Sequence, residues 1–379
     1  MEKIILLGCT QNFPIEFSAS NTKTYFIANG LVNQNCDVCI INSIMGCNIE
    51  NDVTGTYGQI KYYTFPKRKN VFLTLLHNCK KLYNILKYEK NGDKNCIIYC
   101  YNIYPIFLLE RFICFLCNYH FFCIIQEWHS CLKRKNKLIR IFDYLFDHTF
   151  GYFTNGIFPI SHKLQGLCSH FNKQQLIVPV LSSYNDECFQ IDKTEKIFSY
   201  CCNINYLLRN DLIINSFKLV ITKYHDAKLN LILSGDLMQI KQYTTELKKN
   251  GLSNNINIKY QIKTSELELL YKNSLALLIP LNPTSFQDIT RFSQKIAEYV
   301  SSERPIITNN VGEIPYYFNK ESAIIVDYSY KSFADGMIWA IENPTKANEI
   351  GINGKKVGQL HFDYKRNGER IKYFIDHIK

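Results

Sequence analysis

Short apolar runs alternate with helically spaced apolar positions along the first half of the chain. Runs of this kind are typical of buried strands, and they occur at "KIILLG" (3–8), "CDVCIIN" (36–42), "NCIIYCY" (95–101) and "HFFCIIQEWH" (120–129). Apolar residues fall on one helical face within 24–34, 71–90 and 104–117, and "GIFPISHKLQGLC" (156–168) is a further strand-to-helix step. Strands that alternate with helices predict a parallel sheet with crossover helices.

The second half repeats the alternation after a polar, turn-rich stretch at residues 181–195. Strands are predicted at 196–202, 229–236, 256–260, 275–280, 305–310 and 322–328, and helices at 210–225, 240–251 and 264–274. We therefore expect an α/β protein with a first domain at 1–187 and a second at 188–360. The charged, aromatic end, 361–379, is expected to be a helix that packs back on the first domain.

One helix of the second half carries charges beside its buried face. In "FSQKIAEYVSSERPII" (292–307) the apolar residues recur at helical spacing, and Pro305 ends the helix before the next strand. We predict a helix at 291–302. Its flank carries Arg291, Lys295, Glu298 and Ser302.

Composition narrows the class of protein. The chain has 379 residues, 46% of them hydrophobic, which is enough for two folded domains. The excess of 44 Lys and Arg over 33 Asp and Glu favours an anionic partner. Fifteen scattered cysteines, an odd number, suit a reducing cytoplasm better than a disulfide framework. The CxxC pairs at residues 36–39 and 114–117 lie in apolar runs, so we expect small buried side chains there and no metal site.

Neither a membrane span nor a common nucleotide fingerprint is expected. Residues 106–125 are apolar but are interrupted by Glu110, Arg111, Asn118 and His120, and the N-terminus begins directly with a strand pattern. The sequence contains neither GxGxxG nor GxxxxGK[ST]. We therefore expect a protein that is cytoplasmic or peripheral at the inner face of the cytoplasmic membrane.

The order of segments in the second half is similar to that of a known family. "LNLILSGD", "TSELELLYKNSLALLIP", "FSQKIAEYVSSERPIIT" and "VGEIPYYF" together resemble the donor domain of retaining, family-4-type glycosyltransferases. Lys295, Glu298, Tyr299 and Pro305 match the family motif, and the resemblance covers about residues 196–330. It implies the GT-B fold: two doubly wound Rossmann-like domains facing a central cleft, with a nucleotide-sugar bound by the second.

The resemblance also implies roles for individual residues. Glu298 would bind the ribose hydroxyls of the donor, and Lys295 and Arg209 would bind its diphosphate. Ser293, Gln294, Thr290, Asn203 and Gly235 complete the expected donor-binding set. Physical chemistry supports the arrangement, because a diphosphate is stabilised by fixed cations and by the free N–H groups of a helix start. The alternative is an ordinary ion pair on a solvated helix face.

Three departures from the family pattern stand out. Thr290 occupies the place of an acidic residue that usually faces the transferred sugar, with Asp288 nearby. Glu303 replaces a glycine after the helix, which would cost about 1 kcal/mol if the residue is left-handed. The usual Gly-Gly loop near the N-terminus is replaced by "GCTQNFPIEFSASNTKT" (8–24).

The first domain offers candidates for the acceptor side. "IIQEWHS" ends a strand at Glu127 and His129, and the resemblance implies that a histidine here meets the transferred sugar or the acceptor. The segment 132–142 interleaves cations with apolar residues, which suits an anionic membrane surface or a solvated helix face. No nucleic-acid-binding motif accompanies the charge.

The resemblance implies a retaining glycosyltransferase, and the cations and N–H groups of the expected diphosphate site predict a reaction that needs no metal or cofactor. We expect transfer from a UDP- or GDP-sugar to a glycan or polyprenyl-diphosphate-linked acceptor, in the synthesis of a surface polysaccharide such as capsule or lipopolysaccharide. Two alternatives remain: a catalytically silent GT-B subunit that binds a partner, and a GT-B nucleotide-sugar epimerase.

Overall fold

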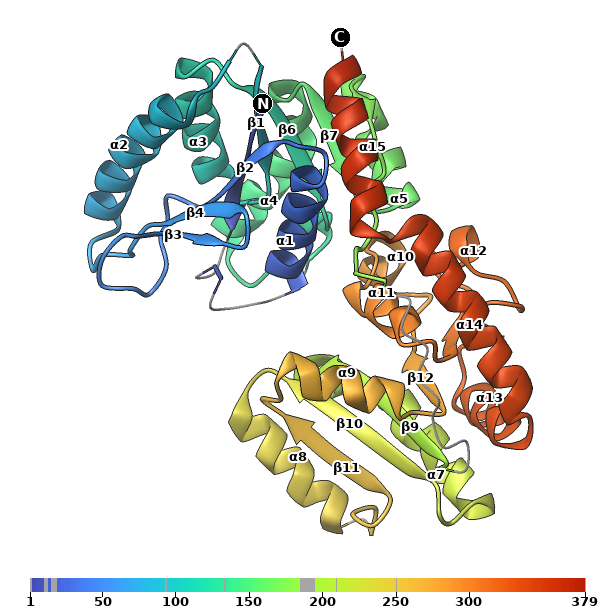
Figure 1. The fold of residues 1–379 in the computed structure, drawn as a ribbon. Coiled ribbons are helices and arrows are strands. Elements are labelled where there is room, and N and C mark those ends of the chain that lie inside the picture. Colours follow the sequence, from blue (N-terminus) through green and yellow to red (C-terminus); the bar gives the residue numbers. More distant parts are fainter. Residues whose placement is uncertain are drawn as a thin grey trace. The chain divides into compact units, whose positions relative to one another are not determined.

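The computed structural model describes residues 2–9, 13–14, 19–92, 94–132, 134–184, 195–208, 210–249 and 251–378 (Figure 1). The chain divides into two compact units. The first comprises Met1–Leu181, Thr290–Phe292 and Asp363–Lys379, and the second comprises Ser182–Ile289 and Ser293–Phe362. The predicted domain limit at 187/188 lies outside the described residues, as do residues 10–12 and 15–18 of the segment that replaces the family's glycine loop.

The first unit is built on an eight-stranded sheet in the order β3-β4-β2-β1-β5-β6-β7-β8. The strands are β1 (Lys3–Cys9), β2 (Asp37–Asn42), β3 (Val53–Tyr57), β4 (Ile60–Thr64), β5 (Asn95–Tyr99), β6 (His120–Ile125), β7 (Gly156–Pro159) and β8 (Gln174–Gln175). Neighbouring strands are parallel except for β3, which is antiparallel to β4. The continuous apolar runs are explained by burial on both faces, since every residue of β5 is buried.

The hairpin of β3 and β4 was not predicted from the apolar pattern. Tyr57 pairs with Ile60 across a two-residue turn, in which Gly58 has a φ of 60°. Every residue of β3 is exposed or half-exposed, so this edge strand has no buried run to mark it.

Six α-helices accompany the first sheet among the described residues: α1 (Ala19–Val32), α2 (Val71–Glu89), α3 (Tyr104–Leu116), α4 (Lys137–Thr149), α5 (His162–Cys168) and α15 (Tyr364–His377). The C-terminal helix α15 lies beside α1 (Figure 1). A Cβ on Gly30 would come within 2.3 Å of the Tyr364 carbonyl oxygen, and one on Gly368 within 2.3 Å of the Gly30 oxygen. Both glycines are therefore required for the two helices to approach this closely.

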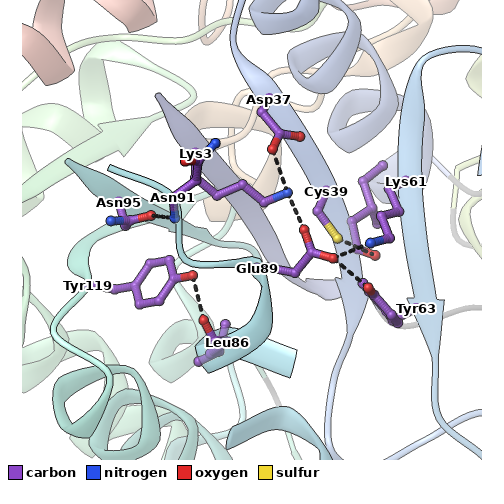
Figure 2. Close-up of polar contacts among 11 residues, drawn as sticks. Lys3, Asp37, Cys39, Lys61, Tyr63, Leu86, Glu89, Asn91, Asn95 and Tyr119 are labelled. Carbon is purple, nitrogen blue, oxygen red and sulfur yellow. Dashed lines mark hydrogen bonds and ion pairs between the residues drawn. The ribbon is translucent and has the colours of Figure 1, made fainter. Parts of the chain in front are cut away.

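A partly buried ionic network lies at the amino-terminal edge of the first sheet (Figure 2). Lys3, only 1% exposed, lies opposite Asp37 in the register of β1 and β2, with its Nζ 3.0 Å from the Asp37 carboxylate. Glu89 at the end of α2 pairs with both Lys3 and Lys61 and accepts a hydrogen bond from Tyr63. Burial alone would lower the pKa of Lys3, but these carboxylates raise it above its usual value. The network holds charges in fixed pairs at the edge opposite the strand ends that bind ligands.

The second unit contains a six-stranded parallel sheet in the order β11-β10-β9-β12-β13-β14. Its strands are β9 (Ile197–Asn203), β10 (Lys228–Ser234), β11 (Ile256–Tyr260), β12 (Ala276–Ile279), β13 (Ile306–Asn309) and β14 (Ile324–Val326). The chain runs outward from β9 to β11 and then returns to β12 on the other side of β9. The strand order therefore reverses between β9 and β12, which is the point where sheets of this type bind nucleotides.

The helices that follow these strands are α6 (Ile204–Leu207), α7 (Leu212–Lys223), α8 (Leu237–Lys249), α9 (Thr264–Lys272), α10 (Phe286–Thr290), α11 (Gln294–Ser301), α12 (Ile314–Tyr317), α13 (Tyr330–Glu342) and α14 (Pro344–His361). The helix predicted at 291–302 begins three residues later than expected, because Ser293, the residue before α11, has an extended backbone. Arg291 and Phe292 precede it and belong to the first unit. The sequence pattern did not predict α13 or α14.

Candidate functional site

Two of the predicted donor-binding residues meet at the carboxyl ends of β9 and β10. Asn203 ends β9 and caps the short helix α6, since its side-chain oxygen accepts a 2.9 Å hydrogen bond from the Asn205 N–H. Gly235 follows β10 with a φ of 114°, and a Cβ there would lie 3.0 Å from the Asn203 amide nitrogen. A glycine is therefore needed at position 235, because the backbone is left-handed there and a side chain would collide with the Asn203 amide.

Helix α11 is fixed to the same edge of the sheet by a buried tyrosine. The Cys201 N–H in β9 donates a 2.9 Å hydrogen bond to the Tyr299 hydroxyl, and the ring of Tyr299 packs edge-on against Tyr271 at 4.8 Å. Lys295 and Glu298 lie on the neighbouring flank of α11 and are half-buried. Both charges act on the Cys201 thiol, whose pKa is raised mainly by burial, and this places them near the end of β9.

Burial raises the pKa of Glu298, whereas the positive charge of Lys295 lowers it. The negative charge of Glu268 adds to the rise. A carboxylate in partial burial is a strong acceptor for hydroxyl donors, and an adjacent ammonium is suited to a phosphate oxygen. The pair can therefore bind a sugar diol and an anion on one helix flank.

The start of α11 supplies backbone donors next to these side chains. Ser293 is the N-cap residue and Gln294, 9% exposed, is the first helical residue. The first N–H groups of a helix have no partner within the helix and carry partial positive charge, which favours an anion. Arg209, the second predicted phosphate ligand, lies outside the described residues.

Thr290 and Asp288 differ from what the family pattern implies for a sugar-facing acid. Thr290 is 2% exposed, and its carbonyl oxygen accepts a hydrogen bond from Ser161 within the first unit. The Asp288 carboxylate is also buried and accepts hydrogen bonds from the Tyr206 hydroxyl at 3.0 Å and the Asn282 N–H at 2.9 Å. These bonds fix the loop after β12 and leave Asp288 as a structural carboxylate.

The predicted acceptor-side residues lie at the carboxyl end of β6 in the first unit. The His129 ring is buried between the Asn102 amide nitrogen, which contacts Nε2, and Asp147, whose Oδ1 lies 3.7 Å from Nδ1. The Ser130 N–H holds the other Asp147 oxygen at 2.6 Å. Glu127 forms a half-exposed ion pair with Arg291 at 3.8 Å.

Asn102 and Asp147 were not singled out in the sequence. Asn102 follows β5, at the same sheet edge as His129, so strand-end position could have identified it. Asp147 is 1% exposed and stands in the final turns of α4, where a buried acid between aromatic residues is a detectable signal.

Comparisons with known proteins agree with this architecture. Residues 185–357 match the family model described as glycosyl transferases group 1. No sequence among the curated proteins matches the chain. Solved structures with the same fold include the sucrose-phosphate synthase of Thermosynechococcus elongatus (12% identity, 98% of each chain, TM-score 0.72) and Alr3699/HepE of Anabaena in complex with UDP-glucose (10% identity, 99% of each chain, TM-score 0.71). A mutant of S. aureus TarM in complex with fondaparinux, alpha-GlcNAc-glycerol and UDP is similar to the same degree (10% identity, 99% of each chain, TM-score 0.71).

The fold is that of the GT-B glycosyltransferases. The residues that match the glycosyl transferases group 1 model, 185–357, lie almost entirely in the second unit.

The described residues contain no group of three or more His, Cys, Asp or Glu side chains arranged to hold a metal ion. Within the same part of the chain, every helix is too short or too polar to cross a bilayer.

Proposed function

We propose that the protein transfers a sugar from a nucleoside-diphosphate sugar to a glycan acceptor, with retention of configuration and without a metal cofactor. The observation that carries the proposal is the placement of Lys295 and Glu298 on α11, fixed to β9 through Tyr299. Solved structures of the same fold contain UDP and UDP-glucose, so UDP-sugars are the first donors to test and GDP-sugars the second.

The leaving diphosphate would be stabilised by charge and by oriented N–H groups. Lys295 would contact the phosphates beside the N–H groups of Ser293 and Gln294, and Arg209 would add a second cation. Glu298 would accept hydrogen bonds from the ribose hydroxyls. Such contacts lower the barrier by stabilising charge that develops as the bond to the sugar breaks.

The acceptor would bind at the carboxyl edge of the first unit, near His129 and Glu127. We propose a lipid-linked glycan, such as a polyprenyl-diphosphate oligosaccharide, with a role in surface polysaccharide synthesis. The exposed, basic and apolar start of α4 supports this choice, because it suits the surface of an anionic membrane. Lys133 of the predicted segment 132–142 lies outside the described residues.

A thermal-shift screen tests the donor part of the proposal. Purified protein is heated with UDP, GDP, ADP and CMP and with their common sugar conjugates, because a ligand that binds the native state raises its stability. We expect a shift with one nucleotide family, its loss in Glu298→Ala, and its retention in Glu246→Ala, an exposed control on α8. The absence of a shift with every nucleotide would contradict the donor site.

A silent binding subunit is the second candidate, and one observation favours it. Thr290 stands where the family has an acid, and the Asp288 carboxylate is engaged by Tyr206 and Asn282. Donor binding without transfer or hydrolysis, in the presence of membrane extracts that contain lipid-linked glycans, would support this candidate. Conversion of the nucleotide-sugar in the absence of any acceptor would instead indicate an epimerase.

A further inference from the structure

The first unit exposes an unusual number of large apolar side chains at the start of α2. Phe72 is 71% exposed and Leu76 is 62% exposed, and Val71 and Leu73 are each at least half exposed. Side chains of this size gather on a protein surface mainly where a partner or a membrane covers them. This cluster was not part of the predicted membrane segment at 132–142.

Exposed cations lie on the N-terminal side of the apolar cluster. Lys67, Arg68 and Lys69 immediately precede α2 and are exposed. We call residues 67–76 the α2 segment. The combination of exposed apolar residues and exposed cations is complementary to a bilayer that has anionic headgroups above an apolar interior.

The α2 segment is held in a fixed conformation by the buried side of the helix. Asn70 caps α2 by accepting hydrogen bonds from the N–H groups of Phe72 and Leu73. The buried Thr74 hydroxyl accepts a 3.0 Å hydrogen bond from the Arg68 N–H, which ties the basic loop to the helix. Asn78, also buried, donates to the carbonyl oxygens of Ile44 and Pro66. The exposed face therefore needs little ordering before it meets a surface.

A second segment with the same composition starts α4. Asn136 caps the helix, and residues 134–144, the α4 segment, expose Leu138, Ile139, Ile141 and Tyr144 beside Lys135, Lys137 and Arg140. Arg134 is bound to Asp143 at 3.0 Å, so this segment is also held against its helix.

The topology brings the two segments to one edge of the first unit. Helices α2, α3 and α4 follow β4, β5 and β6, and each therefore begins at the carboxyl edge of the sheet. The chain moves in one direction through the strand order β4, β5, β6 and β7, so right-handed crossovers put the three helices on one face. Helix α3 contacts both α2 and α4, and α2 and α3 are seen side by side in Figure 1.

We infer that the α2 segment is a membrane-binding element that, together with the α4 segment, docks the carboxyl edge of the first unit on an anionic lipid surface. His129 lies just before α4 at this edge, so docking would bring a lipid-linked acceptor to the predicted acceptor residues. The lipid contact itself does not depend on the proposed sugar transfer, whereas the link to the acceptor rests on it.

Vesicle flotation of the full chain tests the inference. Vesicles are made of phosphatidylcholine alone or of equal parts phosphatidylcholine and phosphatidylglycerol. Binding to the mixed vesicles is expected, with little binding to the neutral ones and a decrease as salt is added. Phe72→Asn/Leu76→Asn should weaken vesicle binding by roughly tenfold or more, and Lys67→Gln/Arg68→Gln/Lys69→Gln by about 100-fold.

A control variant in α8 and a variant in the α4 segment show whether the loss of vesicle binding is specific to the α2 segment. Met238→Asn/Lys248→Gln/Lys249→Gln removes one exposed apolar residue and two exposed cations from α8 of the second unit, and should bind vesicles as wild type does. Loss of binding in Leu138→Asn/Ile141→Asn but not in the α2 variants would overturn the inference and leave α4 as the membrane contact. Equal losses in the α8 control would overturn it as well.

Two other results would also contradict the inference. A dimer in solution that Phe72→Asn/Leu76→Asn dissociates, with no vesicle binding by wild type, would show that a second copy covers the segment. The thermal shift with nucleotide-sugar, measured on every variant, reports the donor site independently. A retained shift with no vesicle binding would reject the membrane surface alone, and vesicle binding without a shift would reject the donor site alone.

Discussion

The Cys201 N–H donates a 2.9 Å hydrogen bond to the Tyr299 hydroxyl, so the helix that carries Lys295 and Glu298 is attached to the end of the first strand of its sheet. Tyr299 is fully buried, and its ring also packs against Tyr271. A side chain in the core thus sets the position of two charged residues on the helix flank. Lys295, Glu298 and Tyr299 lie within five residues of one another in the sequence, and their division between a buried face and a charged flank follows from helical periodicity.

Tyr299→Phe should destabilise the second unit and weaken donor binding. The substitution leaves the Cys201 N–H buried without its acceptor, which costs about 1–2 kcal/mol of unfolding free energy. Tyr271→Phe is the control, because the Tyr271 hydroxyl faces the Cys201 sulfur, a weak acceptor, and its loss should cost little. Urea denaturation measures the first effect and the thermal shift with UDP-sugar the second. Equal stability of Tyr299→Phe and Tyr271→Phe would contradict the anchoring role.

Donor binding should depend on pH through Glu298. Burial raises the pKa of this carboxyl, and Lys295 only partly opposes the rise. Below the raised pKa the carboxyl is protonated and is a poorer acceptor for ribose hydroxyls, so affinity should increase as pH rises through that pKa. The same shift lowers the unfolding free energy over this pH range, because the unfolded chain releases the proton at lower pH than the folded chain.

Calorimetric titration with a nucleotide-sugar at several pH values measures this dependence. A nucleotide-sugar is preferred to the free nucleotide, since its diphosphate lacks the terminal group that titrates near neutral pH. Glu298→Gln should bind more weakly at high pH and show a flat profile. A wild-type profile as flat as that of the variant would remove Glu298 from the donor site.

The fold class could be predicted because strands buried on both faces of a parallel sheet appear in the sequence as continuous apolar runs. Continuous apolar runs such as residues 95–101 predicted the α/β class, and the resemblance to GT-B glycosyltransferases is confirmed. Helix α14 was missed because Gly351, Gly354 and Gly358 interrupt its apolar pattern. These glycines allow close packing, as a Cβ on Gly351 would lie 2.3 Å from the Glu303 carbonyl oxygen.

The contacts of the candidate site residues could not be predicted from the sequence. Arg291 was assigned to the flank of a helix, but it precedes α11 and pairs with Glu127, which is remote in sequence. His129 was identified from its place at a strand end, whereas Asn102 and Asp147 reach it from other elements. Local spacing contains no information on such contacts, because they depend on how separate elements pack.

Glu303 is expected to have two opposing effects on stability: its left-handed backbone costs free energy, and its ion pair with Lys355 stabilises the fold. Its φ of 61° is left-handed, and its carboxylate lies 2.6 Å from the Nζ of Lys355, which is 7% exposed. Glu303→Ala keeps the backbone strain and leaves Lys355 buried without its partner, so a loss of about 3 kcal/mol in unfolding free energy is expected. Glu303→Gly loses the same ion pair but relieves the strain, and should be about 1 kcal/mol more stable than Glu303→Ala. Urea denaturation of the two variants and of wild type measures these differences in unfolding free energy. Equal stability of Glu303→Gly and Glu303→Ala would show that the backbone strain is absent.

Glu110 should make the first unit less stable as pH rises toward neutrality. Its side chain is fully buried on α3, accepting hydrogen bonds from the Tyr99 hydroxyl at 2.6 Å and the Ile44 N–H at 2.8 Å. Burial raises its pKa to about 7, in spite of these bonds. The unfolded carboxyl releases its proton near its ordinary pKa and the folded one only near 7, so the unfolding free energy falls across that interval, by about 3 kcal/mol in total.

Glu110→Gln separates this contribution from those of all other titrating groups. The amide keeps an acceptor for the Ile44 N–H and a polar partner for Tyr99, but it does not ionise. The difference in unfolding free energy between variant and wild type should therefore grow in favour of the variant from about pH 4.5 to 7 and stay constant above. Glu110→Ala is the control, since it removes both hydrogen bonds and should be less stable than Glu110→Gln at every pH. A difference between Glu110→Gln and wild type that does not change with pH would mean that the buried carboxyl keeps its ordinary pKa.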